Sequence, residues 1–214
     1  FYVGSENGTM FSAYRYGSKP GINEKYEGHF GPITAIDCHP ARTSANLGRS
    51  NSNGSILSAA LLTSSSSSDS YNKFSSGEYI LTASMDWTVK LWHPKFSKPL
   101  CSFEEFEDYV YDVKWSPKHP TVFATVDGSS KLKLWNLNQS AEHPIVHVQE
   151  DQHLGKALNR VAWRCDAEKI AAGSGSNGTI YVYNVKQDKL LQENVQWSSQ
   201  AEMNILGTST DFAL

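Results

Sequence analysis

The chain has 214 residues, of which 39% are hydrophobic, a formal net charge of −3 and an isoelectric point near 6.2. A charge balance this close to neutral excludes a broad electrostatic attraction to nucleic acid or to anionic lipid. The sequence contains no run of about eighteen apolar residues and no basic segment leading into an apolar one, so we expect neither a membrane span nor an export signal.

Residues that could carry chemistry are scattered along the chain. Cys38, Cys101 and Cys165 stand far apart, which predicts no disulfide framework and no zinc site and is typical of a reducing compartment. The segment 173–178 matches the glycine pattern of dinucleotide-binding loops, but the residues after it alternate like a strand rather than a helix. We therefore expect no catalytic residue, no metal and no cofactor, and a protein that is not an enzyme.

The chain opens with a hairpin. Residues 1–5 and 9–15 are strand-like and flank Asn7-Gly8, the strongest short-range turn signal. In the repeat described below, this hairpin corresponds to the second and third strands. We therefore expect the chain to begin inside a repeat and to be a fragment of a longer array.

Residues 33–38 form the next predicted strand, and residues 41–77 interrupt the pattern. The interruption is rich in Ser and Asn and predicts a disordered insertion between two strands. A neutral surface loop is the favoured interpretation. The alternative is a regulated segment, phosphorylated near Asp69, whose added charge would control a partner.

The segment 79–92 is the pattern that the rest of the chain repeats. It predicts a strand, a turn at residues 85–87 and a second strand that ends on a Trp. The pattern returns at 122–135 and 170–183, with end residues Trp92, Trp135 and Tyr183 spaced by 43 and 48 residues. A further apolar strand precedes each copy, at 33–38, 110–115 and 161–163. Repeats of this length with four strands each predict an all-β propeller, here about three and a half blades of a probable seven.

Within the second blade, Gly28-His29, Asp86 and Leu91-Trp92 resemble a WD repeat. This resemblance implies a buried hydrogen-bond network made of His29, either Thr82 or Ser84, Asp86 and Trp92. A buried indole N–H and imidazole need such partners. In the next blade Phe106 and Ser129 stand at the His and Asp places, and in the last Ala157 and Asn177 do. We expect these two blades to depend more on apolar packing.

Longer phrases resemble one family in particular. EGHFGPITAIDCHP, SMDWTVKLW, DYVYDVKWSPKHPTVFATVDG, LWNLN and ALNRVAW are similar to the C-terminal propeller of cytoplasmic dynein intermediate chains. The resemblance implies a cytoplasmic, non-catalytic scaffold subunit of a microtubule motor that docks on the dynein heavy chain. It also implies that other dynein subunits bind through regions absent here. The alternative is a WD-repeat adaptor of another pathway, such as a vesicle coat, chromatin or ubiquitin-ligase substrate recognition.

The repeat boundaries define the expected organisation. Residues 1–193 form a partial propeller with blades at 1–27 (incomplete), 28–104, 105–149 and 156–193, and 194–214 form an irregular tail. Turns and connectors on one face supply a candidate protein-binding rim, namely Trp87, Tyr109, Tyr111, Asn159 and Arg160. Trp, Tyr and Arg are the types that anchor interfaces. For Tyr109 and Tyr111, packing between blades is an equally good interpretation.

Overall fold

The computed structural model describes residues 1–17, 20–40, 79–148, 156–176, 178–186, 201 and 203–205. Its strands, in chain order, are β1 (Tyr2–Gly4), β2 (Thr9–Tyr14), β3 (Gly21–Glu27), β4 (Ile33–Cys38), β5 (Ile80–Ser84), β6 (Val89–Trp92), β7 (Cys101–Phe103), β8 (Val110–Trp115), β9 (Val122–Asp127), β10 (Leu132–Asn136), β11 (Val146–Val148), β12 (Leu158–Trp163), β13 (Lys169–Ser174) and β14 (Ile180–Asn184).

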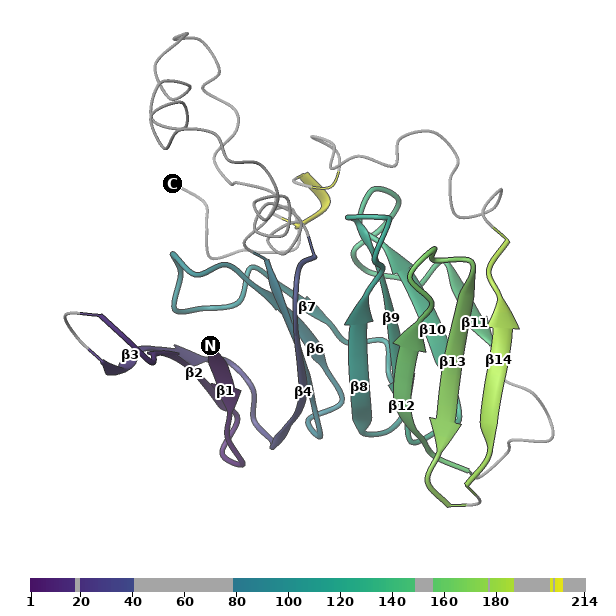
Figure 1. Ribbon diagram of the computed structural model, residues 1–214, viewed down its shortest axis with the longest axis horizontal. Helices are drawn as coiled ribbons and strands as arrows, with labels where there is room; N and C mark the ends of the chain where they lie inside the picture. Colours follow the sequence, from purple (N-terminus) through teal and green to yellow (C-terminus); the bar gives the residue numbers. More distant parts are fainter. Residues whose placement is uncertain are drawn as a thin grey trace, which may run out of the picture.

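These strands form four antiparallel sheets, which we number along the chain. The first sheet is β1-β2-β3, the second β4-β5-β6-β7, the third β8-β9-β10-β11 and the fourth β12-β13-β14. They stand side by side in chain order, with the tight hairpin turns on a common face, at the bottom of Figure 1. Each sheet is one repeat, because neighbouring strands of the sequence pair with each other.

The strand register places the predicted end residues at equivalent positions. Trp92 lies opposite Ile80, Trp135 opposite Phe123, and Tyr183 occupies the same place in the fourth sheet. In the first sheet this place belongs to Ala13, whose backbone N–H donates to the Phe1 carbonyl at 2.9 Å. The predicted phase of the repeat is therefore present in all four sheets.

The hairpin turns of the four sheets share one unusual backbone conformation. A residue with positive φ stands five positions before the end residue of each hairpin, and its φ is 82° at Gly8, 66° at Trp87, 67° at Ser130 and 66° at Gly178. Glycine adopts this left-handed region without steric cost, whereas a bulky side chain rarely does. Trp87 is thus the exceptional residue of the set.

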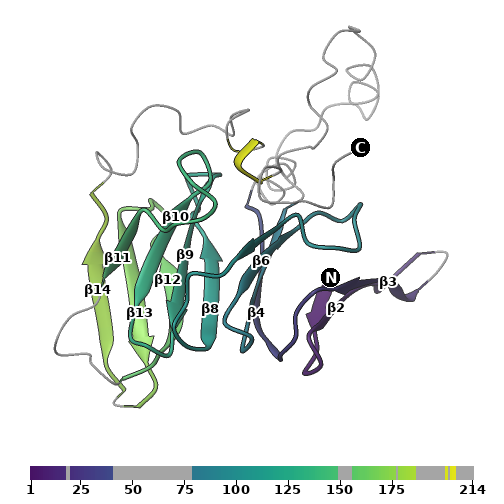
Figure 2. The same ribbon diagram turned by 180° about the vertical axis from the view of Figure 1, so that it is seen from behind.

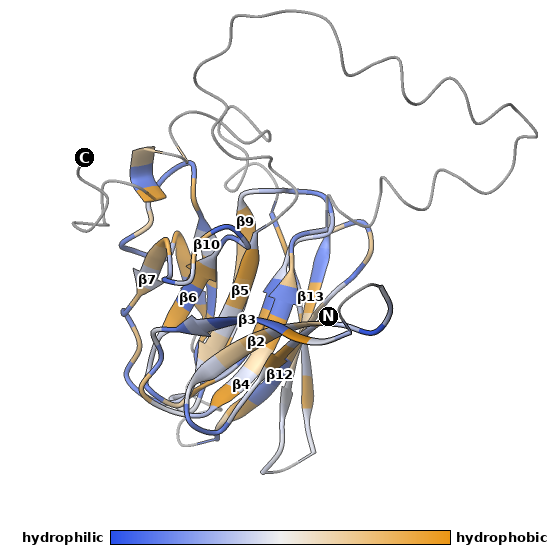
Figure 3. Ribbon diagram, turned by 90° about the vertical axis from the view of Figure 1, so that its left-hand side faces the viewer, coloured by the Kyte–Doolittle hydropathy of each residue, from blue (hydrophilic) through white to orange (hydrophobic). Residues whose placement is uncertain are grey.

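Three apolar clusters fill the spaces between neighbouring sheets. Trp92 packs with Met10, Tyr26 and Ile80 between the first and second sheets. The largest cluster, which includes Trp135, lies between the second and third sheets, and the last lies between the third and fourth. The fully buried β5 belongs to this interior and is coloured largely hydrophobic in Figure 3. Trp92 and Trp135 are each covered by an adjacent sheet, as a repeat array requires.

The first strands of successive sheets, β4, β8 and β12, lie next to one another (Figure 2). Side-chain hydrogen bonds join them. The Thr34 hydroxyl donates to the Val110 carbonyl at 2.6 Å. Asp37 Oδ2 accepts from the Trp115 N–H at 2.8 Å, and Asp112 Oδ2 accepts from the Val161 N–H at 3.0 Å. Burial raises the pKa of Asp37, although the N–H of Trp115 and the charge of Lys114 oppose the shift. These bonds fix the spacing of neighbouring sheets.

The Ser-rich insertion at 41–77 lies outside the described residues, as does most of the predicted irregular tail at 194–214. Within that tail, however, Ala201 and residues 203–205 are helical. Ala201 and Ile205 are buried in the cluster between the second and third sheets, so the irregular-tail prediction is wrong at these positions. Among the residues that the structure describes, no helix is long and apolar enough to cross a membrane.

Candidate protein-binding rim and its polar core

A continuous polar chain lies in the second sheet. Trp92 Nε1–H donates to Thr82 Oγ1 at 2.8 Å, and Thr82 Oγ1 lies 2.6 Å from His29 Nε2. The other ring nitrogen, Nδ1, lies 2.8 Å from Asp86 Oδ2. One tautomer satisfies every group: Nδ1–H donates to Asp86, and Nε2 accepts the Thr82 hydroxyl proton, which leaves Thr82 Oγ1 free to accept from Trp92.

The carboxylate of Asp86 ends this chain at the turn. It also accepts from the Phe30 backbone N–H at 2.9 Å and from the Thr88 hydroxyl at 2.7 Å. Burial alone would raise the pKa of Asp86, but the hydrogen bonds from His29, Thr88 and Phe30 outweigh it and hold the pKa well below its usual range. Burial lowers the pKa of His29, against the opposing effect of Asp86, so this imidazole is neutral at pH 7.

Ser84, the remaining predicted member, lies beside the chain rather than within it. Its hydroxyl donates to the Gly31 carbonyl at 3.0 Å and accepts from the Asp86 N–H at 3.1 Å. Ser84 thereby ties the β5–β6 turn to the connector that enters β4. The structure brings His29, Thr82, Asp86 and Trp92 into one chain and gives Ser84 a separate role.

The third sheet fills the same space with a different set of polar groups. Trp135 Nε1–H still donates to a threonine, Thr125, at 3.1 Å. Phe106 replaces the imidazole, and the Lys133 ammonium lies 4.3 Å from the centre of its ring and 3.2 Å from Asp127 Oδ2. Both charged side chains are buried. Phe106 also packs against Trp135 in the apolar cluster, and the expectation that this blade depends more on apolar packing stays a prediction. A buried ion pair with a cation–π contact also stands in this sheet.

The fourth sheet has neither arrangement among its described residues. Ala172 stands at the threonine position and Tyr183 at the Trp position. The strand register also corrects one assignment, because Leu158 aligns with Ile33 and Val110 at the start of the first strand. His29 and Phe106 lie four residues before Ile33 and Val110, whereas Ala157 lies one residue before Leu158, so Ala157 does not stand at the His place. Asn177, assigned to the Asp place, lies outside the described residues.

The predicted rim residues follow the turn face, where hairpin turns meet the connectors. Met85 N–H donates to the Pro32 carbonyl at 3.0 Å, and Gly128 N–H donates to the Tyr109 carbonyl at 2.9 Å. The Ser130 hydroxyl donates to the Lys156 carbonyl at 2.6 Å. The first two bonds join a turn to the connector of its own sheet, and the third joins the third sheet to the connector of the fourth. We call the side of the molecule formed by these turns and connectors the turn face.

The five rim residues differ in what they offer a partner. Trp87 and Tyr109 are exposed, whereas Tyr111 is half-buried at the strand irregularity of β8. Asn159 Oδ1 accepts from the Gly175 N–H at 2.7 Å, so this side chain serves its own hairpin turn. The Arg160 side chain is 74% exposed and lies 4.0 Å from Asp112. Of the five, Trp87, Tyr109 and Arg160 are the most accessible, and the rim itself stays a prediction.

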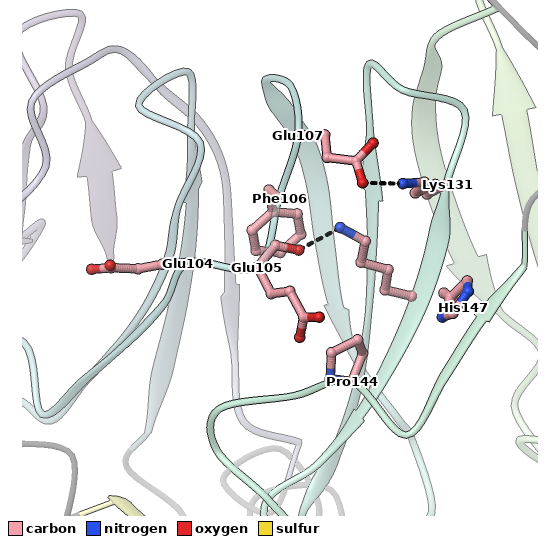
Figure 4. Close-up of a pocket in the computed structure, with 8 residues that line it drawn as sticks. Glu104, Glu105, Phe106, Glu107, Lys131, Pro144 and His147 are labelled. Atoms are coloured by element: carbon pink, nitrogen blue, oxygen red, sulfur yellow. Dashed lines mark hydrogen bonds and ion pairs between the residues drawn. The ribbon is translucent and has the colours of Figure 1, made fainter.

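A hollow of about 420 Å³ lies beside the third sheet (Figure 4). Glu105, Phe106 and Glu107 form one wall, and Lys131 and His147 lie opposite. Its cations already have partners, because Lys131 pairs with Glu107 and Lys133 with Asp127. In the part of the chain that the structure describes, no group of three or more His, Cys, Asp or Glu residues could hold a metal ion.

With this geometry established, comparisons with known proteins identify the repeat. Residues 22–93 and 97–136 match the family described as "WD domain, G-beta repeat". The chain belongs to this WD-repeat family. Two solved structures share the fold: the C-terminal WD40 domain of Sif2, with a TM-score of 0.58 and 17% identity, and a chain of the mitotic checkpoint complex, with a TM-score of 0.62 and 14% identity. Each match covers 87% of this chain. It covers 40% of the Sif2 chain and 47% of the checkpoint-complex chain. The predicted all-β, partial WD-repeat propeller is confirmed.

The WD-repeat chain is also similar to a motor subunit. It is 40% identical over 198 residues to the Drosophila melanogaster protein named cytoplasmic dynein 1 intermediate chain. The match covers 92% of this chain and 25% of that protein, so the chain spans about a quarter of the relative's length. The resemblance to dynein intermediate chains seen in the sequence is therefore confirmed.

Sequence reasoning missed several residues that shape this surface. Phe30 follows the motif His directly, and its side chain is almost fully exposed; an aromatic residue in a connector was the available signal. Lys133 was missed because a charged residue on a strand normally predicts a solvent-facing side. The available signal was that Lys133 and Lys90 stand at equivalent positions of their hairpins, each opposite the buried threonine of the neighbouring strand.

Proposed function

We propose that this WD-repeat chain is part of a dynein intermediate chain and acts as a non-catalytic scaffold that docks on the dynein heavy chain. The observation that carries the proposal is the 40% identity over 92% of the chain. Exposed aromatic and Arg side chains on the turn face give it a surface for docking. ATP hydrolysis then belongs to the heavy chain, and the protein is expected in the cytoplasm on microtubule-bound motors.

The residues of the polar core support this role indirectly. The Asp86 chain ties the connector 28–31 to the β5–β6 turn, and Ser130 ties the β9–β10 turn to the next connector. A docking surface made of loops requires such fixation, since ordering loops on binding costs affinity. We therefore propose that His29, Thr82, Ser84, Asp86 and Trp92 hold the rim in shape and do not themselves touch the partner.

The test is co-purification from cells of the full-length protein that contains this chain. We expect the heavy chain to be recovered with it at a fixed stoichiometry under native conditions, and depletion of the protein to disperse minus-end-directed cargo. Recovery of a coat, chromatin or ubiquitin-ligase assembly without heavy chain would establish the adaptor alternative instead.

A further inference from the structure

A cleft of about 350 Å³ lies at the turn face between the first and second sheets. Gly8, Glu27, His29 and Phe30 are among the residues that line it. Gly8 has a φ of 82°, and a Cβ atom there would lie 2.4 Å from the His29 carbonyl oxygen. The first hairpin turn therefore rests directly on the connector that carries His29, and the cleft is formed before any partner arrives.

Apolar side chains are exposed at this cleft and on the β5–β6 turn, to which the Phe30 connector is hydrogen-bonded. Phe30 is 95% exposed, and Trp87 and Met85 are 48% and 37% exposed. The hydrogen bond from the Phe30 N–H to Asp86 places the connector beside the β5–β6 turn, from which Met85 and Trp87 project. Three large apolar residues gathered on adjoining loops are typical of an interaction surface rather than of scattered surface residues.

Trp87 adds an observation independent of exposure. Its φ of 66° is the left-handed conformation that glycine supplies in the first and fourth hairpins. A tryptophan is unfavourable there, and the turn would form more easily with glycine. Backbone outliers of this kind concentrate at functional sites, where the side chain serves something other than the fold.

The charges around the cleft favour a cation. Glu27 is the one carboxylate among its lining residues, and Glu6 lies in the adjoining hairpin turn. His29 contributes no positive charge, because burial lowers its pKa. Lys25 forms an ion pair with Glu27, but both side chains are more than half exposed, so a partner can displace it.

We propose that this cleft takes an arginine side chain from a segment of the dynein heavy chain, with Trp87 and Met85 contacting apolar residues next to that arginine. Arginine suits the site because its planar guanidinium stacks on aromatic rings and pairs with a carboxylate through two hydrogen bonds. The assignment of the partner depends on the proposed function, whereas the chemistry of the cleft follows from Glu27, Phe30 and Trp87.

The first test measures heavy-chain affinity of the full-length protein with single substitutions. Phe30→Ser and Trp87→Gly should each weaken binding about tenfold, and Glu27→Gln about threefold to tenfold. Lys25→Gln should tighten binding, because it removes the competing cation. Tyr16→Ser is the matched control, since Tyr16 is 78% exposed in the loop between β2 and β3, outside the cleft, and it should leave affinity within twofold.

The melting temperature separates a docking role from a structural one. Trp87→Gly should leave it within about 2 °C of the wild type, because relief of the left-handed strain offsets the lost contacts. A large fall in melting temperature with unchanged affinity would overturn the proposal. Equal affinity of the wild type, Phe30→Ser and Trp87→Gly would overturn it as well, whereas a wild type that does not bind heavy chain would refute the proposed function.

Photo-crosslinking identifies the occupant. A benzophenone amino acid placed at position 30 of the full-length protein should crosslink to one heavy-chain segment that contains an arginine. Substitution of that arginine by Gln should reproduce the loss seen with Glu27→Gln, and the two changes together should cost no more than either alone. A crosslinked segment without arginine would overturn the proposal.

Discussion

The second and third sheets have the same strand order and register but different polar interiors. In the second sheet, a chain of hydrogen bonds runs from the indole of Trp92 through the neutral Thr82 and His29 side chains to the partly buried carboxylate of Asp86. In the third, the indole of Trp135 keeps its threonine, but an ion pair between Asp127 and Lys133 occupies the remaining space. The indole–threonine bond is the shared element.

The difference shows which part of the repeat is free to change. The indole N–H is buried between sheets and must have an acceptor, so Thr82 and Thr125 stand at the same position. The groups beyond the threonine need only satisfy one another. His29 with Asp86 does so through hydrogen bonds, and Lys133 with Asp127 does so through charge, with Phe106 covering the ammonium.

The largest effect is expected from breaking the buried ion pair. Lys133→Met leaves the Asp127 carboxylate buried without a counter-charge and should destabilise the fold by about 3–5 kcal/mol. The matched variant is Lys90→Met, at the equivalent position of the second sheet, where the ammonium bonds to the Ser102 hydroxyl at 2.8 Å. That change should cost less than about 1 kcal/mol. Chemical denaturation of the domain that contains these sheets measures both.

A compensated variant sharpens this test. Ser84 occupies the place of Asp127 in the second sheet, so Asp127→Ser combined with Lys133→Met should recover most of the lost stability. A double variant no more stable than Lys133→Met alone would show that the ion pair does more than neutralise its own charges.

Removal of the shared threonine should have a smaller effect that differs between the sheets. Thr82→Val leaves both the Trp92 N–H and His29 Nε2 without a partner and should cost about 2–3 kcal/mol. Thr125→Val leaves one donor, that of Trp135, and should cost about 1–2 kcal/mol. Equal losses in denaturant unfolding would contradict the idea that the threonine joins two partners only in the second sheet.

The second sheet should also respond to pH. The pKa of His29 is lowered by burial, so the unfolded chain binds a proton there at a higher pH than the folded protein. Its contribution to stability is therefore complete above about pH 6.5 and is lost as the pH falls, by up to about 1.4 kcal/mol per pH unit. The pKa of Asp86 is lowered too, so its contribution is lost in a separate window below about pH 4.

Replacing the imidazole by the residue of the third sheet tests this assignment. His29→Phe should flatten the pH dependence of the unfolding free energy between pH 7 and 5, although it lowers stability at pH 7. Part of the slope should remain, because burial lowers the pKa of His39 and His119 in the same direction. An unchanged slope would mean that His29 is protonated in the folded protein.

The smallest effect belongs to the exposed ion pair at the edge of the Figure 4 hollow. Glu107 is 70% exposed on its side chain, and Lys131 lowers its pKa. Solvent screens such a pair, so Glu107→Gln should move the denaturation midpoint no further than experimental error. A clear loss of stability would show that the outer pair supports the buried Asp127–Lys133 pair.

The positions of Trp92, Trp135 and Tyr183 were predictable because strand period and repeat spacing are both local patterns. The His place of the fourth sheet was misassigned to Ala157, because the apolar pattern placed the start of the first strand at Val161, whereas β12 begins at Leu158. The ion pair of Asp127 and Lys133 joins two strands, and each residue alone suggested a solvent-facing side.

The sequence by itself determined the repeating hairpins and the face on which their turns lie. It also identified the complete His–Thr–Asp–Trp set of the second sheet. All three follow from the spacing of residue types along the chain. Only the tertiary structure decided which charges are buried, that the Phe30 connector lies against the turn that carries Trp87, and that Ala201 and Ile205 pack between two sheets. These depend on contacts between residues far apart in sequence, and such contacts form only when one sheet is laid against the next.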